Sequence, residues 1–137
     1  MHITGQCHCG HIAFEADADP SHVGICHCTD CQRLTGSPFR VTLSVERSAL
    51  RIGDNKPSVY RKIAENGLPR NQHFCPQCGS PLFTSGEGDD AKIWGVRWGS
   101  INERDALVPK GQIWTRSAVG WLSDIDDLPA YEKDRSE

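Results

Sequence analysis

The chain is organised around the stretch Cys26-His27-Cys28-Thr29-Asp30-Cys31, which places three thiols within six residues. Cysteines this close together cannot comfortably form disulfides with one another, and buried apolar cysteines rarely cluster in this way. Thiolates separated by one and two residues can converge on one soft cation, for which Zn²⁺ is the usual choice. Three protein ligands leave one position of a tetrahedral ion open, as in catalytic zinc sites. The stretch therefore predicts a working zinc site.

The other four cysteines form two short-gap pairs, Cys7/Cys9 and Cys75/Cys78. The second pair is a Cys-Pro-x-Cys-Gly zinc knuckle, in which the glycine lets the chain turn back on the sulfurs. Two such pairs close a tetrahedral site, so the sequence predicts two Zn²⁺ per chain. Spacing alone does not decide which pairs join. One zinc with three spare thiols, or some cysteines simply buried, are the alternatives.

Apolar and polar residues alternate over many short segments, and this period indicates strands with one buried face. The predicted strands are 12–16, 22–25, 39–45, 50–53, 59–63, 92–98 and 112–115. One short helical turn is expected after Cys28, with Thr29-Asp30 as its cap and Gly36 at its end. Gly and Pro are frequent and no long helical period occurs. The pattern predicts an all-β protein with little helix, whose core includes Trp94, Trp98, Trp114 and Trp121.

Length and charge narrow the possible functions further. A chain of 137 residues is most simply one domain over 1–137, with 131–137 as a loose terminal tail. The net charge is −3, and binding zinc through thiolates would make it more negative, which disfavours nucleic-acid binding. No apolar run approaches signal-peptide or membrane-span length. We expect a cytoplasmic protein without a membrane partner, in which reduced thiols favour metal binding or catalysis.

Three motifs occur in a specific order: Gly5-x-Cys7-x-Cys9-Gly10, Cys26-His27-Cys28-x-x-Cys31-x-Arg33-x-x-Gly36 and Phe74-Cys75-x-x-Cys78-Gly79. A closing segment, 113–132, contains Ile-Trp, a later Trp and Asp-Leu-Pro-x-Tyr-Glu. This ordered set resembles the GFA family, named after glutathione-dependent formaldehyde-activating enzyme and including the centromere protein V-like domain. Many relatives have a histidine before Ile-Trp, where this chain has Gln112.

The resemblance implies a β-tent fold, in which small antiparallel sheets lean together around zinc. It implies a structural zinc on Cys7, Cys9, Cys75 and Cys78, and a catalytic zinc on Cys26, Cys28 and Cys31. The implied activity is that of a zinc-dependent carbon–sulfur lyase that forms or cleaves S-(hydroxymethyl)glutathione, with a small thiol, glutathione, as its partner. The alternative is a non-enzymatic, zinc-stabilised binding module. The sequence leaves the oligomeric state open.

A zinc ion with three thiolates is a weak Lewis acid but binds a further thiol well, so thiol-adduct chemistry suits it better than hydrolysis. Addition of a thiol to an aldehyde leaves an oxygen that needs a proton, and His27, Asp30 and His73 are the candidate donors. His27 is the tentative acid/base, and each of the three also has a structural interpretation. Arg33 and Arg40 can pair with glutathione carboxylates or lie on the surface.

Overall fold

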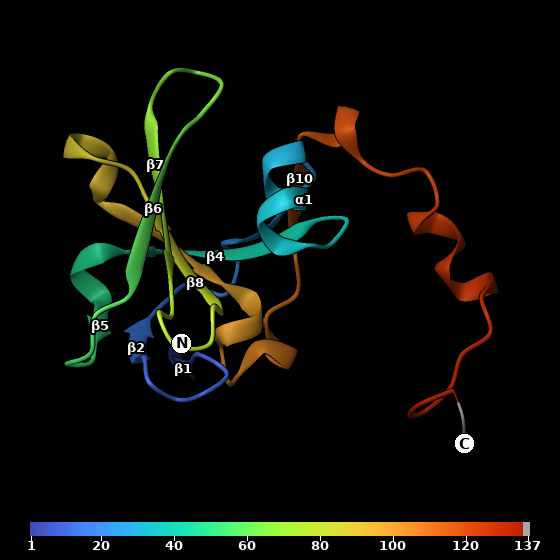
Figure 1. Ribbon diagram of the computed structural model, residues 1–137, viewed down its shortest axis with the longest axis horizontal. Helices are drawn as coiled ribbons and strands as arrows, with labels where there is room; N and C mark the ends of the chain where they lie inside the picture. Colours follow the sequence, from blue (N-terminus) through green and yellow to red (C-terminus); the bar gives the residue numbers. More distant parts are fainter. Residues whose placement is uncertain (136–137) are drawn as a thin grey trace.

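The computed structural model describes residues 1–135 of the chain, and its strands form two sheets (Figure 1). The smaller sheet has the order β1-β2-β5, and the larger has the order β10-β3-β4-β9-β8-β7-β6. Neighbouring strands are antiparallel, except that β10 runs parallel to β3. The strands are β1 (His2–Gln6), β2 (Ala13–Asp17), β3 (Val23–Cys26), β4 (Arg40–Glu46), β5 (Leu50–Ile52), β6 (Ser58–Ile63), β7 (Pro69–Phe74), β8 (Pro81–Ser85), β9 (Ile93–Arg97) and β10 (Gly111–Ile113).

Helices are short throughout the part of the chain that the structure describes. α1 (Thr29–Thr35) is its one α-helix. The 3-10 helices are η1 (Arg47–Ala49), η2 (Gly88–Ala91), η3 (Trp98–Ser100), η4 (Arg104–Ala106), η5 (Thr115–Ser117) and η6 (Leu122–Asp127). Within residues 1–135 no helix is long and apolar enough to cross a membrane. The predicted all-β class with little helix, arranged as small sheets, is confirmed.

Strands β1, β7 and β8 are absent from the sequence prediction, and burial explains why. All six residues of β7 are half-buried, so its sequence shows no alternation of apolar and polar residues. β8 is buried on both faces from Leu82 to Ser85, although two of these residues are polar. In β1 an inward position is taken by Gly5, which carries no apolar signal. The strands that the sequence does not predict are therefore those in which polar and apolar residues do not separate onto opposite faces.

The core lies between the two sheets. Alternate residues of β2 and β4 are buried, as their sequences predict, among them Phe14, Leu43 and Val45. The Phe14 ring meets Phe83 of the larger sheet edge-on, with ring centroids 5.1 Å apart. Such aromatic pairs add to the free energy gained from removing apolar area from water. The apolar faces of the two sheets are thus buried against each other.

The second face of the larger sheet is polar and remains open. Arg40 and Thr42 of β4 project opposite to Leu43, and Arg97 of β9 is the register partner of Thr42. Gln72 of β7 is the register partner of Thr84 on β8, which continues this row. Alternation along these strands therefore produces a polar surface next to Cys26, the last residue of β3. This surface becomes one wall of the site described below.

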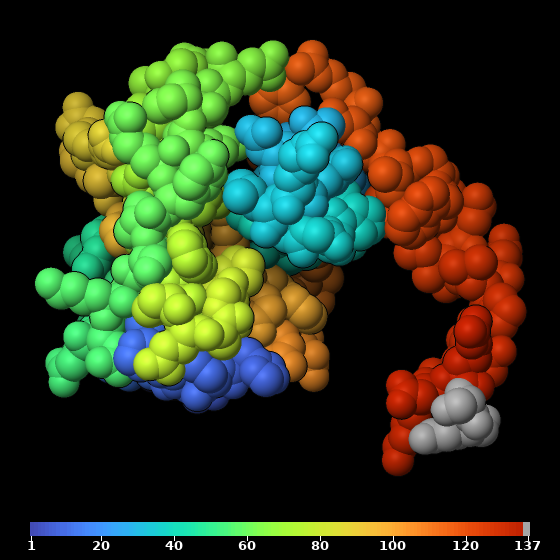
Figure 2. Space-filling view, in the orientation of Figure 1, coloured from blue at the N-terminus to red at the C-terminus, as the bar shows by residue number. Residues whose placement is uncertain are grey.

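After β10 the chain continues as an arm (residues 114–135), which contacts the β6–β7 hairpin and α1 near its start and ends away from the sheets on one side (Figure 2). Trp121 is 53% exposed and Trp114 is 39% exposed, so their prediction as core residues is wrong. β10 is an edge strand, and the residues that follow it have no sheet to pack against. Trp94 and Trp98 do pack against the core, as predicted. Of the predicted loose tail 131–137, residues 136 and 137 lie outside the described residues.

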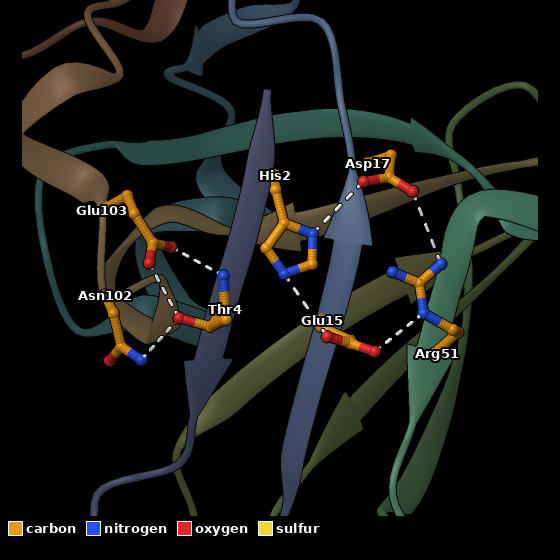
Figure 3. Close-up of polar contacts among 7 residues, drawn as sticks. All are labelled: His2, Thr4, Glu15, Asp17, Arg51, Asn102 and Glu103. Atoms are coloured by element: carbon orange, nitrogen blue, oxygen red, sulfur yellow. Dashed lines mark hydrogen bonds and ion pairs between the residues drawn. The ribbon is translucent and has the colours of Figure 1, made fainter.

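Polar contacts fasten β1, the edge of the smaller sheet, on both sides (Figure 3). Glu103 accepts hydrogen bonds from the backbone N–H of Thr4, at 2.6 Å, and from the Thr4 hydroxyl, at 2.8 Å. Asn102 donates a further bond to that hydroxyl, at 3.0 Å. On the other side of β1, the ring of His2 lies 3.2 Å from Asp17 and 3.3 Å from Glu15, both on β2. The backbone N–H of Thr4 holds the pKa of Glu103 below its ordinary value of 4.5.

Replacing Glu103 by Gln is expected to destabilise the protein by about 1 kcal/mol at pH 7, because a charge-assisted hydrogen bond to an edge strand is weakened. A carboxylate with a lowered pKa stabilises the fold above its unfolded pKa and loses that effect as the pH falls through its folded pKa. The difference in unfolding free energy between wild type and variant should therefore shrink below about pH 4.5. Urea titrations at pH 7 and pH 3.5 would measure it, and a pH-independent difference would contradict this account.

Gly5 of the first cysteine motif lies under the ring of Phe14 and beside the backbone carbonyl of Ser100. A Cβ at this position would overlap both groups. Gly5→Ala is therefore expected to cost about 3 kcal/mol or more, as overpacking of a rigid site does. Gly111→Ala is the matched control, because a Cβ there has no neighbour within 4 Å. Equal melting temperatures for the two variants would refute the close packing at Gly5.

Candidate metal centres

Four cysteines from distant parts of the chain meet at one end of the sheets. Cys7 and Cys9 follow β1, whereas Cys75 and Cys78 lie in the turn between β7 and β8. The Sγ of Cys9 is 3.7 Å from that of Cys7 and 3.7 Å from that of Cys75, and all four Sγ atoms lie within 4.8 Å of one another. The structure therefore brings together the two pairs that the family resemblance joins.

The backbone around this cluster folds into two similar knuckles. The N–H of Ile12 points to the Cys7 sulfur at 3.3 Å, and the N–H of Gln77 points to the Cys75 sulfur at 3.3 Å. Gly79 has a φ of 78°, which lets the chain reverse after the second pair. The Ser80 hydroxyl, 3.2 Å from the Cys78 sulfur, leads the contacts that lower the pKa of Cys78 to about 5. These contacts stabilise thiolates.

The donor set fits a tetrahedral metal ion. Sulfurs bound to zinc at about 2.3 Å in a tetrahedron lie about 3.8 Å apart, which matches the observed 3.7 Å. All seven cysteines are free thiols in the structure, so none of these contacts is a disulfide. The four-cysteine cluster is compatible with zinc. It is also compatible with a structural role, because four cysteine sulfurs would fill all four coordination positions of a tetrahedral ion.

The three remaining cysteines converge where β3 meets α1. Cys26 ends β3, Cys28 is the N-cap residue of α1 and Cys31 lies in its first turn. Their Sγ atoms also lie within 4.8 Å of one another. The sulfur of Cys28 accepts a hydrogen bond from the backbone N–H of Cys31, at 3.2 Å. Burial, followed by the hydrogen bonds of the neighbouring thiols, raises the pKa of Cys31 to about 12.

The predicted helix is confirmed, including its left-handed end at Gly36, but its predicted cap is wrong. Helix α1 begins at Thr29, so Thr29 and Asp30 lie within the first turn and Cys28 caps it. Asp30 instead pairs with Lys62 of β6, with 2.8 Å between carboxylate oxygen and Nζ. This ion pair links the β6–β7 hairpin to the helix that carries two of the cysteines.

The three-cysteine cluster opens onto a cavity of about 1010 Å³. The polar face of the larger sheet forms one wall, the β6–β7 hairpin another, and β10 with Trp114 a third. A volume of this size accommodates a small organic molecule. Polar residues that line it include Arg40, Thr42, Lys62, Glu65, Arg70, Gln72, Thr84, Arg97 and Gln112. Arg40 is among the site residues predicted from the sequence, whereas Arg97 and Gln72 are not. Alternation along β9 and β7, which lie on either side of β8, places both on this face.

The predicted histidines occupy different places. His27 is 2% exposed, and its Nε2 lies 2.7 Å from Oε1 of Gln112, whereas its buried Nδ1 has no hydrogen-bond partner among the described residues. His27 itself does not line the cavity, and Gln112 does. His73 lies away from the cavity, stacked on Trp94 with 4.6 Å between ring centroids. Arg33 is exposed and also lies off the cavity wall.

Substitutions should distinguish the structural role of the four-cysteine cluster from the role of the three-cysteine cluster. Cys75→Ala removes a ligand that joins distant segments, so we expect loss of one bound metal and a melting temperature lower by about 10 °C or more. Cys28→Ala should also lose one metal, yet lower the melting temperature by less than half as much, because its cluster lies within one local segment. Elemental analysis and calorimetry on the same preparations measure both. Equal destabilisation would contradict this division of roles.

Comparisons with known proteins agree with the cysteine pattern. The family model described as "Glutathione-dependent formaldehyde-activating enzyme" (GFA) matches residues 2–117. A Halomonas elongata protein provisionally named as such an enzyme is 31% identical in an alignment 88 residues long, which covers 61% of this chain and 55% of that protein. The crystal structure of a Rhodobacter sphaeroides protein has a similar fold, with a TM-score of 0.59 and 21% identity over 82% of this chain and 99% of that one. The family match spans both cysteine clusters, and the chain therefore belongs to the GFA family.

Proposed function

We propose that the protein is a zinc-dependent carbon–sulfur lyase that forms or cleaves a thiol–aldehyde adduct, with S-(hydroxymethyl)glutathione as the family's example. Two zinc ions are part of the proposal. Cys7, Cys9, Cys75 and Cys78 would hold a structural ion, and the three-cysteine cluster would hold a catalytic one. One observation carries the proposal: three converging thiols face a cavity, and within residues 1–135 no histidine or carboxylate completes their set.

The reaction needs few groups. A substrate thiolate uses a lone pair to form the sulfur–carbon bond, the C=O π pair moves to oxygen, and the oxygen takes one proton. The reverse reaction breaks the same bond and returns the proton. Zinc with three thiolate ligands would supply an electron-rich cation that favours a substrate sulfur in its thiolate form. No oxidant or reductant is required.

The protein's own contribution is enclosure and orientation. The β6–β7 hairpin is held over the cavity by the Lys62–Asp30 pair and by Arg116, whose Nη2 lies 3.4 Å from Glu65. The first pair is the more sheltered, because the Lys62 side chain is 18% exposed whereas Arg116 is 71% exposed. These contacts would hold one wall of the cavity in place beside the cysteines, where a substrate thiol would be oriented.

His27 fits a positioning role better than direct proton transfer. Gln112 lies between its ring and the cavity, and the His27 backbone N–H is bonded to the Ile113 carbonyl at 3.1 Å. These contacts fix the loop between Cys26 and Cys28 against β10. A role of His27 as acid or base stays a prediction. Its test is the pH profile of His27→Gln, which a positioning role would leave unchanged in shape.

Carbon-13 exchange NMR on labelled formaldehyde with glutathione tests the activity itself. We expect zinc-loaded protein to accelerate exchange between free formaldehyde and the glutathione adduct, and Cys28→Ala to abolish the acceleration. Gly120→Ala serves as the control, because a Cβ there has no neighbour within 4 Å and Gly120 does not line the cavity. Lack of acceleration at confirmed zinc content would refute lyase activity on this adduct. The non-enzymatic binding module would then be the better account.

Two broader assignments accompany this proposal. We take residues 1–137 as one GFA-type domain, although the family match ends at residue 117. A cytoplasmic location suits free thiols and a glutathione-class substrate, because that compartment keeps thiols reduced. The aligned region is 55% of the Halomonas relative, so the activity in that protein's name is carried over here only as part of the proposal.

A further inference from the structure

We infer that the cavity beside the three cysteines is an anion site, in which Arg40 and Arg97 bind a carboxylate of the thiol substrate. The inference rests on the proposed function and narrows it to carboxylate-bearing thiol adducts. It assigns a specificity role to Arg97, which lies outside the cysteine motifs.

The position of the two arginines follows from strand register. Arg40 is the register partner of Cys26 across β3 and β4, so it lies directly beside the cysteine cluster. Arg97 is the register partner of Thr42, two residues further along β4 and on the same face. Both arginines line the cavity that the cysteines face. A single small molecule in this cavity can therefore reach the cluster and the arginines together.

Neutral groups hold the two guanidinium groups side by side. Gln72 Oε1 accepts from Arg97 Nη2 at 2.7 Å and from Arg40 Nη1 at 3.0 Å. The other contact of Arg97 is with the Thr42 hydroxyl, at 2.9 Å. Arg40 is only 5% exposed, and its buried Nε has no hydrogen-bond partner among the described residues. A nearly buried guanidinium group with an unpaired N–H is costly, and an anion in the cavity beside it would offset part of that cost through its charge.

No carboxylate of residues 1–135 pairs with either arginine. The one carboxylate of residues 1–135 on the cavity wall, that of Glu65, pairs with Arg116, and Asp30 pairs with the wall residue Lys62. Burial, and next the charge of Arg40, lower the pKa of Arg97 to about 9, which leaves it charged at pH 7. The pair is thus two positive charges without an acidic partner.

Charge balance at the site then calls for an anion. Three thiolates, one Zn²⁺ and a substrate thiolate would together carry a net charge of −2. The cavity wall holds three guanidinium groups, those of Arg40, Arg97 and Arg70. One carboxylate on the substrate would neutralise the remaining positive charge, and a guanidinium group binds it with paired N–H donors. A thiol without a carboxylate would leave that charge uncompensated.

The test compares acid and ester forms of one thiol. Zinc-loaded protein is titrated with glutathione and with glutathione diethyl ester by calorimetry, and the formaldehyde exchange rate is measured with each. We expect the acid to bind at least about tenfold more tightly than the diester, as hydrogen bonds to a charged group predict. Arg97→Gln and Arg40→Gln should weaken binding of the acid about tenfold and leave binding of the diester unchanged.

Controls keep this result interpretable. Arg61→Gln removes an exposed arginine on β6 that pairs with Glu87 away from the cavity, so it should retain the acid preference. Arg97→Lys keeps the charge and should retain part of that preference, and it replaces Arg97→Gln if that variant does not fold. Metal content and melting temperature are measured for every variant.

The outcomes separate the anion site from the lyase proposal. Arginine-dependent binding of the acid without faster exchange would support the anion site and refute lyase activity on this adduct. Faster exchange at equal rates and affinities for acid and diester would refute the anion site and support the lyase. An acid preference that survives both arginine substitutions would also overturn the inference.

Discussion

Convergence of four thiols from both halves of the chain is the constraint on which the rest of the structure depends. Cys7 and Cys9 follow the first strand of the smaller sheet, and Cys75 and Cys78 lie in a turn of the larger sheet. Their contact closes a loop of more than sixty residues, within which β2 to β7 must fit. Strands this short bury little area individually, so a link between the sheets fixes how they face each other.

The two sheets in turn determine which face is left for chemistry. Because the smaller sheet covers the apolar face of the larger one, the polar rows of β4, β9 and β7 have no partner within the core. The three-cysteine cluster lies at the end of β3, beside these rows. A hairpin and the edge strand β10 enclose the space. The cavity is thus a consequence of strand alternation, with the cysteine loop at its margin.

Local chemistry is what the sequence predicts well here. The cysteine spacings predict the three-cysteine cluster and the two short-gap pairs, because a metal-binding motif needs residues at fixed short gaps, and the family resemblance joins the two pairs into one cluster. Alternation identifies strands such as β4 and β9, whose two faces differ in polarity. It fails at β7, where every residue is half-buried, and hence at Gln72, whose role depends on that strand. Trp121 is mispredicted because burial of an aromatic residue depends on a neighbouring element, and the chain has left the sheets by then.

The capping of α1 shows how closely fold and site are coupled. A helix needs an acceptor for its first N–H groups, and oxygen-bearing side chains usually supply it. Here the sulfur of Cys28 takes that place, which leaves Asp30 free to hold the hairpin through Lys62. A change at Cys28 would therefore act on the helix start as well as on metal binding. The same displacement lets Asp30 neutralise Lys62 on the cavity wall, so the positive charge left in the cavity belongs to its arginines.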